Sequence, residues 1–418
     1  LASASLFAQG SLTPPSGPAP SMKTLGQIEP RTAIEKLPYK ISASGAYYLA
    51  ANLSVPAGVN GISVDASNVT LDLNGFTLRG AALSEAAISI VPGKADVTIY
   101  NGAITAAGAG VEGSAAVRVR VEGVRVSNCT GSGISLGAEG SVNHCDAHEN
   151  GTTGIRVGLS GTILNSRAHA NGANGIETDQ KSTVRESAAA RNAFAGISAA
   201  DYSKVMNSIA TDNNANGINA GAGVHITDCT ASANKQSGIN GGQLCLVTRA
   251  SACWNAQGGV VVQDSSSVID SSTSGNGWIG IATGSYAQVT NSKADANAGG
   301  GIFVQRGSTV RDCSVQRNSN DGIVLTDQCT ISRNSASNNS NLKGVAGIHA
   351  KGTDNVLQEN NLVANDRGLA LDSEGNLVVK NTATNNSLNF YVVGDQTMAP
   401  VITTFENGEA NPMSNIAF

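Results

Sequence analysis

The 418-residue sequence predicts an all-β solenoid, a rod in which each repeat of the chain forms one coil stacked on the previous one. Two observations lead to this fold class. A Gly-Ile or Gly-Val pair recurs every 21 residues from Gly133 to Gly322. Within each repeat, apolar and polar residues alternate with the period of a strand. The 49 glycines, with Ser, Thr and Asn, fill positions where a helical repeat needs strong helix formers.

Residues 1–22 are predicted to be a leader outside the solenoid. The first residues are typical of the end of a signal peptide, with a small-residue cleavage site near Ala8. The Pro- and Ser-rich stretch that follows has no core of its own. The alternative is a chain that begins inside an ordinary strand. We expect a protein that is secreted or displayed on the cell surface.

The solenoid itself is expected over residues 61–387, with fifteen coil starts. Looser copies of the pair flank the regular series, three before it and two after it, at Gly61, Ala87, Gly110, Gly347 and Gly368. A single coil cannot bury its apolar face alone, but coils stacked ~4.8 Å apart bury it against one another. Residues 23–60 and 388–418 depart from the repeat, and we expect them to cap the two ends.

One column of the repeat is asparagine in ten successive coils, and stacking predicts a ladder along the rod. Its members are Asn150, Asn171, Asn192, Asn213, Asn234, Asn255, Asn276, Asn297, Asn318 and Asn339. Stacked amides can bond to one another and to the turn backbone. Asparagine also tolerates the left-handed conformation of a turn. Ten repeats of one residue indicate a structural role, so we expect neither a metal nor a cofactor there.

Three stretches resemble the secreted bacterial right-handed parallel β-helix repeat proteins, which share the pectate-lyase-like superfold. The stretches are Met22–Arg31 with Leu37-Pro38 and Gly45–Leu49, Val69–Leu78 with Val97–Ile104, and the ladder of coils. The resemblance implies a single right-handed parallel β-helix. It implies no particular chemistry, because the fold class includes pectate and alginate lyases, polygalacturonases, epimerases, phage tailspikes, adhesins and proteins without known catalysis.

Composition argues against two classes of partner. The net charge is -5 and the pI is near 5.6, so the basic surface that nucleic-acid binding needs is missing. No run of ~18 apolar residues occurs, and we expect no helical membrane span. The polygalacturonase-like aspartate clusters and Gly-His-Gly are absent, as is an Asp/Glu cluster with calcium-loop spacing.

The best catalytic candidates lie in one outward column of the repeat. Asp228 and Asp270 are two coils apart, or ~9.6 Å at the standard spacing. That separation touches the upper edge of the ~6.5–9.5 Å range of inverting glycosidases. Arg249 lies between them in the column, and His225 and Lys204 lie nearby. The alternative is a solvated face on which Arg249 relieves repulsion between the two acids.

Binding candidates come from apolar and aromatic residues that should face outward. The second residue after each repeat glycine is polar in the early coils and apolar in four later ones, Val261, Ala282, Phe303 and Val324. This strip is either a docking surface or a face covered by the 25-residue coil or the C-terminal segment. Four further aromatics either stack on sugar rings or simply cover the solenoid at its turns, namely Tyr202, Tyr286, Trp254 and Trp278.

Six of the seven cysteines form three pairs separated by 16 residues, Cys129/Cys145, Cys229/Cys245 and Cys313/Cys329. Pairing across a thin interior would bring such residues within the ~7 Å Cα limit of a disulfide, and export permits oxidation. The alternative is that cysteine serves as a small buried residue. His148 and His169 stack in another column, but two histidines without a third ligand are a weak metal site.

The sequence therefore favours a secreted or cell-surface, non-catalytic β-solenoid. It would bind extracellular polysaccharide or protein partners, or assemble structurally. If an end cap is incomplete, the exposed sheet edge would allow head-to-tail stacking into a filament. The alternative is a polysaccharide lyase or glycoside hydrolase that acts on an extracellular polymer.

Overall fold

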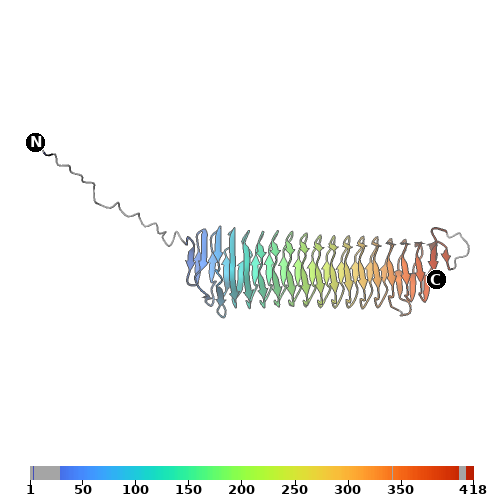
Figure 1. The fold of residues 1–418 in the computed structure, drawn as a ribbon, viewed down its shortest axis with the longest axis horizontal. Helices are drawn as coiled ribbons and strands as arrows, with labels where there is room; N and C mark the ends of the chain where they lie inside the picture. The colour runs from blue at the N-terminus through green and yellow to red at the C-terminus, as the bar shows by residue number, and fades with distance from the viewer. Residues whose placement is uncertain (1–2, 4–28, 341, 404–410) are drawn as a thin grey trace.

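The computed structural model describes residues 3, 29–340, 342–403 and 411–418. The predicted leader, apart from Ser3, lies outside these ranges, so the signal-peptide prediction is not addressed by them. The described chain is a straight rod of stacked parallel coils, with its N-terminal coils at one end and residue 418 at the other (Figure 1). It contains fifty-one strands and no helix. The predicted all-β solenoid is confirmed.

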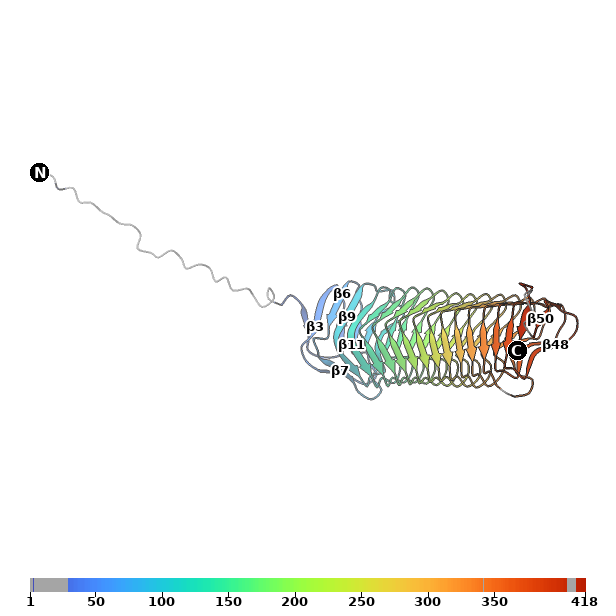
Figure 2. The same cartoon turned by 45° about the vertical axis from the view of Figure 1, so that its right-hand side comes forward.

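Each regular coil places one short strand in each of three parallel ladders. Figure 2 shows the strands of neighbouring coils lying side by side along the rod. The first ladder follows the repeat glycines and comprises β2 (Tyr39–Ile41), β5 (Ile62–Val64), β8 (Ala86–Ile90), β10 (Ala109–Gly113), β12 (Ile134–Leu136), β15 (Ile155–Val157), β18 (Ile176–Thr178), β21 (Ile197–Ala199), β24 (Ile218–Ala220), β27 (Ile239–Gly241), β30 (Val260–Val262), β33 (Ile281–Thr283), β36 (Ile302–Val304), β39 (Ile323–Leu325), β42 (Ala346–Ala350), β45 (Arg367–Leu371) and β48 (Leu388–Val392).

The second ladder runs along an adjacent face of the rod. It comprises β1 (Thr32–Ile34), β3 (Gly45–Leu49), β6 (Val69–Asp72), β9 (Val97–Thr105), β11 (Arg120–Ser127), β13 (Ser141–Asn143), β16 (Thr162–Leu164), β19 (Thr183–Arg185), β22 (Lys204–Met206), β25 (His225–Thr227), β28 (Leu246–Thr248), β31 (Ser267–Ile269), β34 (Gln288–Thr290), β37 (Thr309–Arg311), β40 (Thr330–Ser332), β43 (Val356–Gln358), β46 (Leu377–Val379) and β49 (Thr397–Met398).

The third ladder shares the long strands β9 and β11 with the second. Its other members are β4 (Leu53–Val55), β7 (Thr77–Gly80), β14 (Asp146–His148), β17 (Arg167–His169), β20 (Ala188–Ala190), β23 (Ile209–Thr211), β26 (Thr230–Ser232), β29 (Ser251–Cys253), β32 (Ser272–Ser274), β35 (Lys293–Asp295), β38 (Ser314–Gln316), β41 (Ser335–Ser337), β44 (Asn361–Val363), β47 (Thr382–Thr384) and β51 (Asn415–Ala417), with β50 (Val401–Ile402) beside β51.

Three corners bend each regular coil, and the residue at each corner has a positive φ. In the coil that begins at Gly133 these residues are Glu139, His144 and Glu149, with φ of 55°, 50° and 54°. The left-handed conformation is costly for a residue with a side chain. Stacking offsets that cost, because each corner N–H donates to a carbonyl of the next coil, as His144 N does to Leu164 O at 3.2 Å.

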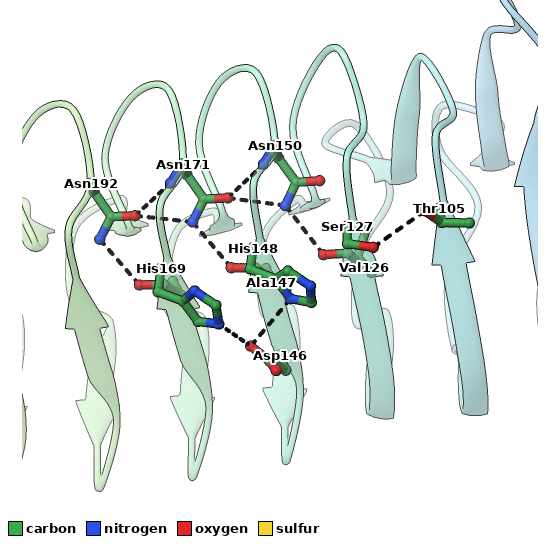
Figure 3. A network of polar contacts seen from close by, with 11 residues as sticks. Thr105, Val126, Ser127, Asp146, Ala147, His148, Asn150, His169, Asn171 and Asn192 are labelled. Atoms are coloured by element: carbon green, nitrogen blue, oxygen red, sulfur yellow. Dashed lines mark hydrogen bonds and ion pairs between the residues drawn. The ribbon is translucent and has the colours of Figure 1, made fainter.

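The predicted asparagine ladder is confirmed, because the side-chain amide of each member donates to that of the next one along the rod, as Figure 3 shows for Asn150, Asn171 and Asn192. Asn171 Oδ1 accepts from the backbone N of Asn150 at 3.1 Å and from its Nδ2 at 3.0 Å. Asn171 Nδ2 also donates to Ala147 O at 3.1 Å. One expectation was wrong. The left-handed residue is the one before each asparagine, here Glu149, and the asparagine turns inward to bind the corner.

The repeat glycine and the asparagine ladder depend on each other. A Cβ at Gly154 would stand 2.6 Å from Asn171 Nδ2 and 2.7 Å from Gly175 O. No other residue fits where the amide of one coil and the carbonyl of the next converge. The 21-residue glycine column is therefore a packing requirement, and the isoleucine after it points into the core.

None of the three predicted disulfides is formed in the structure, in which all seven cysteines are free thiols. Six of them are buried, and Cys253 is half-buried. The two members of a predicted pair follow different corners, Cys229 after Asp228 and Cys245 after Leu244. Each of the six buried thiols donates to at least one backbone carbonyl, as Cys229 Sγ does to Thr227 O at 3.3 Å. Serine is the most frequent other residue in the columns that hold Cys229 and Cys245, so cysteine serves there as a small buried residue.

The ends of the chain belong to the solenoid more fully than expected. β2 pairs with β5, and β48 pairs with β45, although neither follows a Gly-Ile pair. Seventeen strands therefore form the first ladder, against fifteen predicted coil starts. β51 completes the third ladder against β47. None of the described segments is a helix of the length and apolarity that crossing a membrane requires.

Candidate functional site

The predicted catalytic column is an exposed row of paired corner residues. Arg249 Nε lies 2.6 Å from Asp228 Oδ1, and its Nη2 lies 2.8 Å from Oδ2. The hydrogen bond from Arg249 lowers the pKa of Asp228 below its usual range. Asp270 accepts from Asn291 Nδ2 at 2.7 Å. An ionised Asp228 has no proton to donate at neutral pH, so this geometry gives it no role as a general acid.

His225 and Lys204 lie beside each other on β25 and β22 of the second ladder. Both side chains are exposed. Neither they nor the three corner residues line the two grooves described below. The structure therefore brings the five predicted residues to one region of the surface. None of the five lines the hollow of about 450 Å³ that lies in the same corner column in earlier coils, which is lined by residues that include His144, Glu186 and Asn207.

Three of the predicted binding aromatics cover glycines. Tyr202, Tyr286 and Trp254 are corner residues, and each ring lies against the positive-φ glycine at the same corner of the next coil. This placement accounts for their exposure without a ligand. The fourth aromatic, Trp278, lies elsewhere, in the turn that leads into the first-ladder strand β33, and the residue is 57% exposed.

The apolar strip forms a pair of open grooves on the outer face of the first ladder. One groove, of about 410 Å³, is lined by residues that include Val261, Ala282 and Gln305. The other, of about 290 Å³, is lined by residues that include Val324, Asp321 and Lys351. Trp278 and Phe303 line both. No described residue after Lys351 lines either groove.

A charged cluster adjoins the second groove. His349 on β42 is held between two carboxylates, with Nδ1 3.0 Å from Asp321 Oδ2 and Nε2 2.8 Å from Asp372 Oδ2. Burial favours the neutral ring, but the hydrogen bonds to Asp321 and Asp372 outweigh it and raise the pKa of His349. Asp321 also accepts from Ala346 N at 2.7 Å. The imidazole is therefore fixed in place, with its charged form favoured.

Sequence reasoning missed this cluster although its signal was present. His349 occupies the same outward column as Phe303 and Val324, one coil further along. Asp321 precedes a repeat glycine, and Asp372 follows the end of β45. The three residues come from consecutive coils. Their proximity becomes visible in the sequence only when each residue is assigned its position within its coil.

A family model described as a right-handed β-helix region matches residues 60–215 and 239–388. The chain belongs to the right-handed β-helix family. The match also confirms the resemblance from which a right-handed helix was predicted. Membership of this family defines the fold of the β-helix protein. Its chemistry has to be inferred from the residues of the site. No curated protein matches the chain.

Solved structures similar to this β-helix protein include three carbohydrate-active proteins. The mannuronan C-5 epimerase A-module of Azotobacter vinelandii is 16% identical, with 80% of this chain and 91% of that chain covered and a TM-score of 0.39. A double mutant of a periplasmic alginate epimerase is 13% identical, covering 74% and 84%, with a TM-score of 0.41. The catalytic domain of an alpha-1,3-glucanase is 12% identical, covering 77% and 62%, with a TM-score of 0.36.

Proposed function

We propose that the protein binds an extracellular polysaccharide in the two grooves that meet at Trp278 and Phe303. The observation that carries the proposal is that these two aromatic side chains line both grooves and stand above an apolar floor. Sugar rings present apolar faces that stack on aromatic side chains. Since the grooves follow one another along the axis, a polymer that lies along the rod would occupy both.

Polar groups at the two ends of the strip supply hydrogen bonds for sugar hydroxyls. Gln263, Asp264 and Gln305 line the first groove. Asp321 and Lys351 line the second. This arrangement of an apolar centre with a polar rim is the usual anatomy of a specific binding surface. The side chains of the rim carry both signs of charge, which suits a polymer bound chiefly through its hydroxyls.

The contacts of His349 favour binding over catalysis as the function of the grooves. Both of its ring nitrogens are occupied by carboxylates. A general base needs a free nitrogen within reach of the proton that it abstracts. The geometry therefore favours a protein that holds its ligand without cleaving it.

A polysaccharide lyase or glycoside hydrolase is the second candidate, and one observation favours it. Asp321 lines the groove while holding His349, so an acid-base pair adjoins the proposed ligand site. The other partner, Asp372, has a side chain that is 43% exposed. Its movement into solvent would free Nε2 of His349 for proton transfer.

Binding is tested by affinity electrophoresis against a panel of neutral and uronate-containing polysaccharides. We expect one polymer class to retard the native protein. Trp278→Ala should weaken that binding by about 2 kcal/mol, the scale of an interface hot spot. The matched control is Trp254→Ala, an exposed tryptophan that lies on Gly275 away from the grooves. Equal losses in the two variants, or no retention by any polymer, would contradict the proposal.

Catalysis is tested with the same panel by following unsaturated and reducing ends. The binding proposal predicts no release above the background of heat-treated protein. Release that disappears in His349→Gln, with binding retained, would establish the second candidate instead. Release that persists in that variant would place the chemistry elsewhere on the surface.

Export is part of the binding proposal, because polymers of this kind lie outside the cytoplasm. Its support is the signal-peptide-like start of the sequence. Fractionation of cells that express the full chain, with a cytoplasmic marker as control, tests it. Recovery of the protein with the cytoplasmic marker alone would contradict export.

Head-to-tail assembly stays a separate prediction. Within the described residues β2 pairs only with β5, so one of its edges faces no other strand. An open edge is a template for pairing with a second molecule. Electron microscopy of the purified full chain tests it, with filaments supporting assembly and single rods contradicting it.

A further inference from the structure

A compact group of metal-ligating side chains lies on the outer face of the third ladder, far from the grooves in sequence. Asp146 and His148 are two residues apart on β14 and so share one face of that strand. His169 on β17 pairs in register with His148. The two imidazole rings are stacked, with centroids 4.9 Å apart and planes 5° from parallel (Figure 3).

Asp146 supplies the third ligand that the histidine pair alone lacks. Its Oδ1 lies 3.7 Å from His148 Nδ1 and 3.5 Å from His169 Nε2. The three ligand atoms all lie within 4.8 Å of one another. Both distances to Oδ1 exceed the range of a normal hydrogen bond, so the three groups face one point without bonding to each other.

Two of these atoms are left unsatisfied by the protein. Asp146 Oδ1 and His148 Nδ1 are buried from solvent and have no hydrogen-bond partner. Buried polar atoms without partners are costly and call for an explanation such as an ion. Arg125 and Arg167 flank Asp146 in the ladder. The only ion-pair contacts of Asp146 among the described residues are nonetheless with the two histidines.

We propose that Asp146, His148 and His169 bind one divalent first-row transition-metal ion, with Zn²⁺ the best-fitting occupant. Two imidazole nitrogens and one carboxylate oxygen form a donor set that suits Zn²⁺ and its neighbours. Ca²⁺ and Mg²⁺ prefer oxygen ligands alone and are disfavoured. Three protein ligands leave at least one coordination position open to solvent or to a further ligand.

Closing the site around an ion requires the two imidazole rings to rotate. A tetrahedral Zn²⁺ with ligands at ~2.0–2.2 Å holds its donors about 3.4 Å apart. Asp146 Oδ1 is already close to that distance from each nitrogen, but the parallel rings must tilt to bring their two nitrogens toward a shared point. Their side chains are 27% and 32% exposed, which leaves room for that rotation. The backbone beneath them is held by the asparagine ladder, through Asn171 Nδ2 to Ala147 O and Asn192 Nδ2 to Ala168 O.

The test is metal titration of the untagged, chelator-treated full chain. We expect one Zn²⁺ per chain by calorimetry, a rise in Tm, and visible absorption when Co²⁺ replaces Zn²⁺. The informative variants are His169→Ala and Asp146→Ala, because alanine already occupies the aligned positions of β20, at Ala190 and Ala188. Each should weaken Zn²⁺ binding at least tenfold, the lower end of what even outer-shell changes produce.

The matched control is His225→Ala, which removes an exposed histidine of the second ladder. It should leave the affinity, stoichiometry and Co²⁺ spectrum unchanged. No stoichiometric binding by the native protein would overturn the proposal. So would undiminished binding in His169→Ala, or an equal loss in the His225→Ala control. Circular dichroism of each variant checks that it retains the β spectrum.

Discussion

The ring of Tyr202 lies over Gly223, the residue at the same corner of the next coil. A Cβ at Gly223 would stand 2.7 Å from Tyr202 Cδ1, and φ at this glycine is 65°. The same arrangement recurs in Tyr286 with Gly307 and in Trp254 with Gly275. An aromatic ring over a bare glycine shields backbone that has no side chain of its own. The exposure of these rings therefore follows from corner packing.

Gly223→Ala should destabilise the rod by about 1–3 kcal/mol, since the new Cβ both strains a left-handed residue and displaces the tyrosine ring. The measurement is the Tm by circular dichroism. Gly123→Ala is the control, because Gly123 has φ of 61° but nothing within 4 Å of its Cβ position. The control carries backbone strain alone, and an equal loss of Tm in the two variants would refute the packing role of Tyr202.

Asn234→Ala should lower the free energy of unfolding by on the order of 3 kcal/mol, because it leaves several buried hydrogen-bonding groups without partners. Asn234 Oδ1 accepts from the N and Nδ2 of Asn213, both at 3.0 Å, and its Nδ2 donates to Ala210 O at 3.1 Å. Denaturant unfolding gives the measurement.

The control for that variant is Asn240→Ala, which removes an outward amide that donates to Asn219 Oδ1 at 3.0 Å. It should cost less than about 1 kcal/mol, as expected of a single half-buried hydrogen bond. Similar losses in the two variants would show that the ladder contributes no more than surface amides do.

The thiols should be reduced and unreactive in the folded protein. Burial raises the pKa of the Cys229 thiol to about 11, and that of Cys313 likewise. The thiolate is the reactive form, so a thiol reagent at pH 8 should label at most the half-buried Cys253 before unfolding and all seven cysteines after it. Fewer than seven labelled thiols in denaturant without reductant would restore the disulfide prediction.

The His349 cluster should make stability depend on pH. The pKa of His349 is raised in the folded state, so the protonated ring is favoured on folding. The resulting stabilisation is fully present below the unfolded pKa of ~6.5 and is lost as the pH rises through the folded value. The groups that face the ring are Asp321 and Asp372, with Lys351 nearby at the groove.

The measurement is Tm against pH for the native protein and for His349→Gln. The difference between them should shrink as the pH rises above 6.5. His225→Gln, which removes an exposed histidine outside the cluster, serves as the control. A difference in Tm between the native protein and His349→Gln that grows with pH would contradict this account. It would mean that the two carboxylates do not stabilise the protonated ring of His349.

The fold was largely predictable because one period controls several columns at once. The glycine column, the asparagine column and the apolar columns all repeat at 21 residues from Gly133 to Gly322. Stacking turns that period into contact between like residues. The end coils were missed because β2 and β48 lack the Gly-Ile pair, and their place in the ladder depends on pairing to a neighbour.

The candidate sites were harder to predict because they combine different positions of neighbouring coils. The apolar strip follows one column and was found. His349, Asp321 and Asp372 come from three different positions of consecutive coils, and Asp146 joins His148 through the two-residue period of a strand. Such groupings depend on the directions of the side chains. An alignment of the repeats gives the position of each residue in its coil but not its side-chain rotamer.

Every site described here requires that each 21-residue repeat makes one coil. The most direct test is distance measurement by electron paramagnetic resonance between spin labels on the outer face of the first ladder. Labels replace Arg156 paired with Asn240, four coils away, or with Val324, eight coils away, in a Cys253→Ser background. At ~4.8 Å per coil we predict separations near ~19 Å and ~38 Å. A second distance that is not about twice the first would contradict the stacked-coil account.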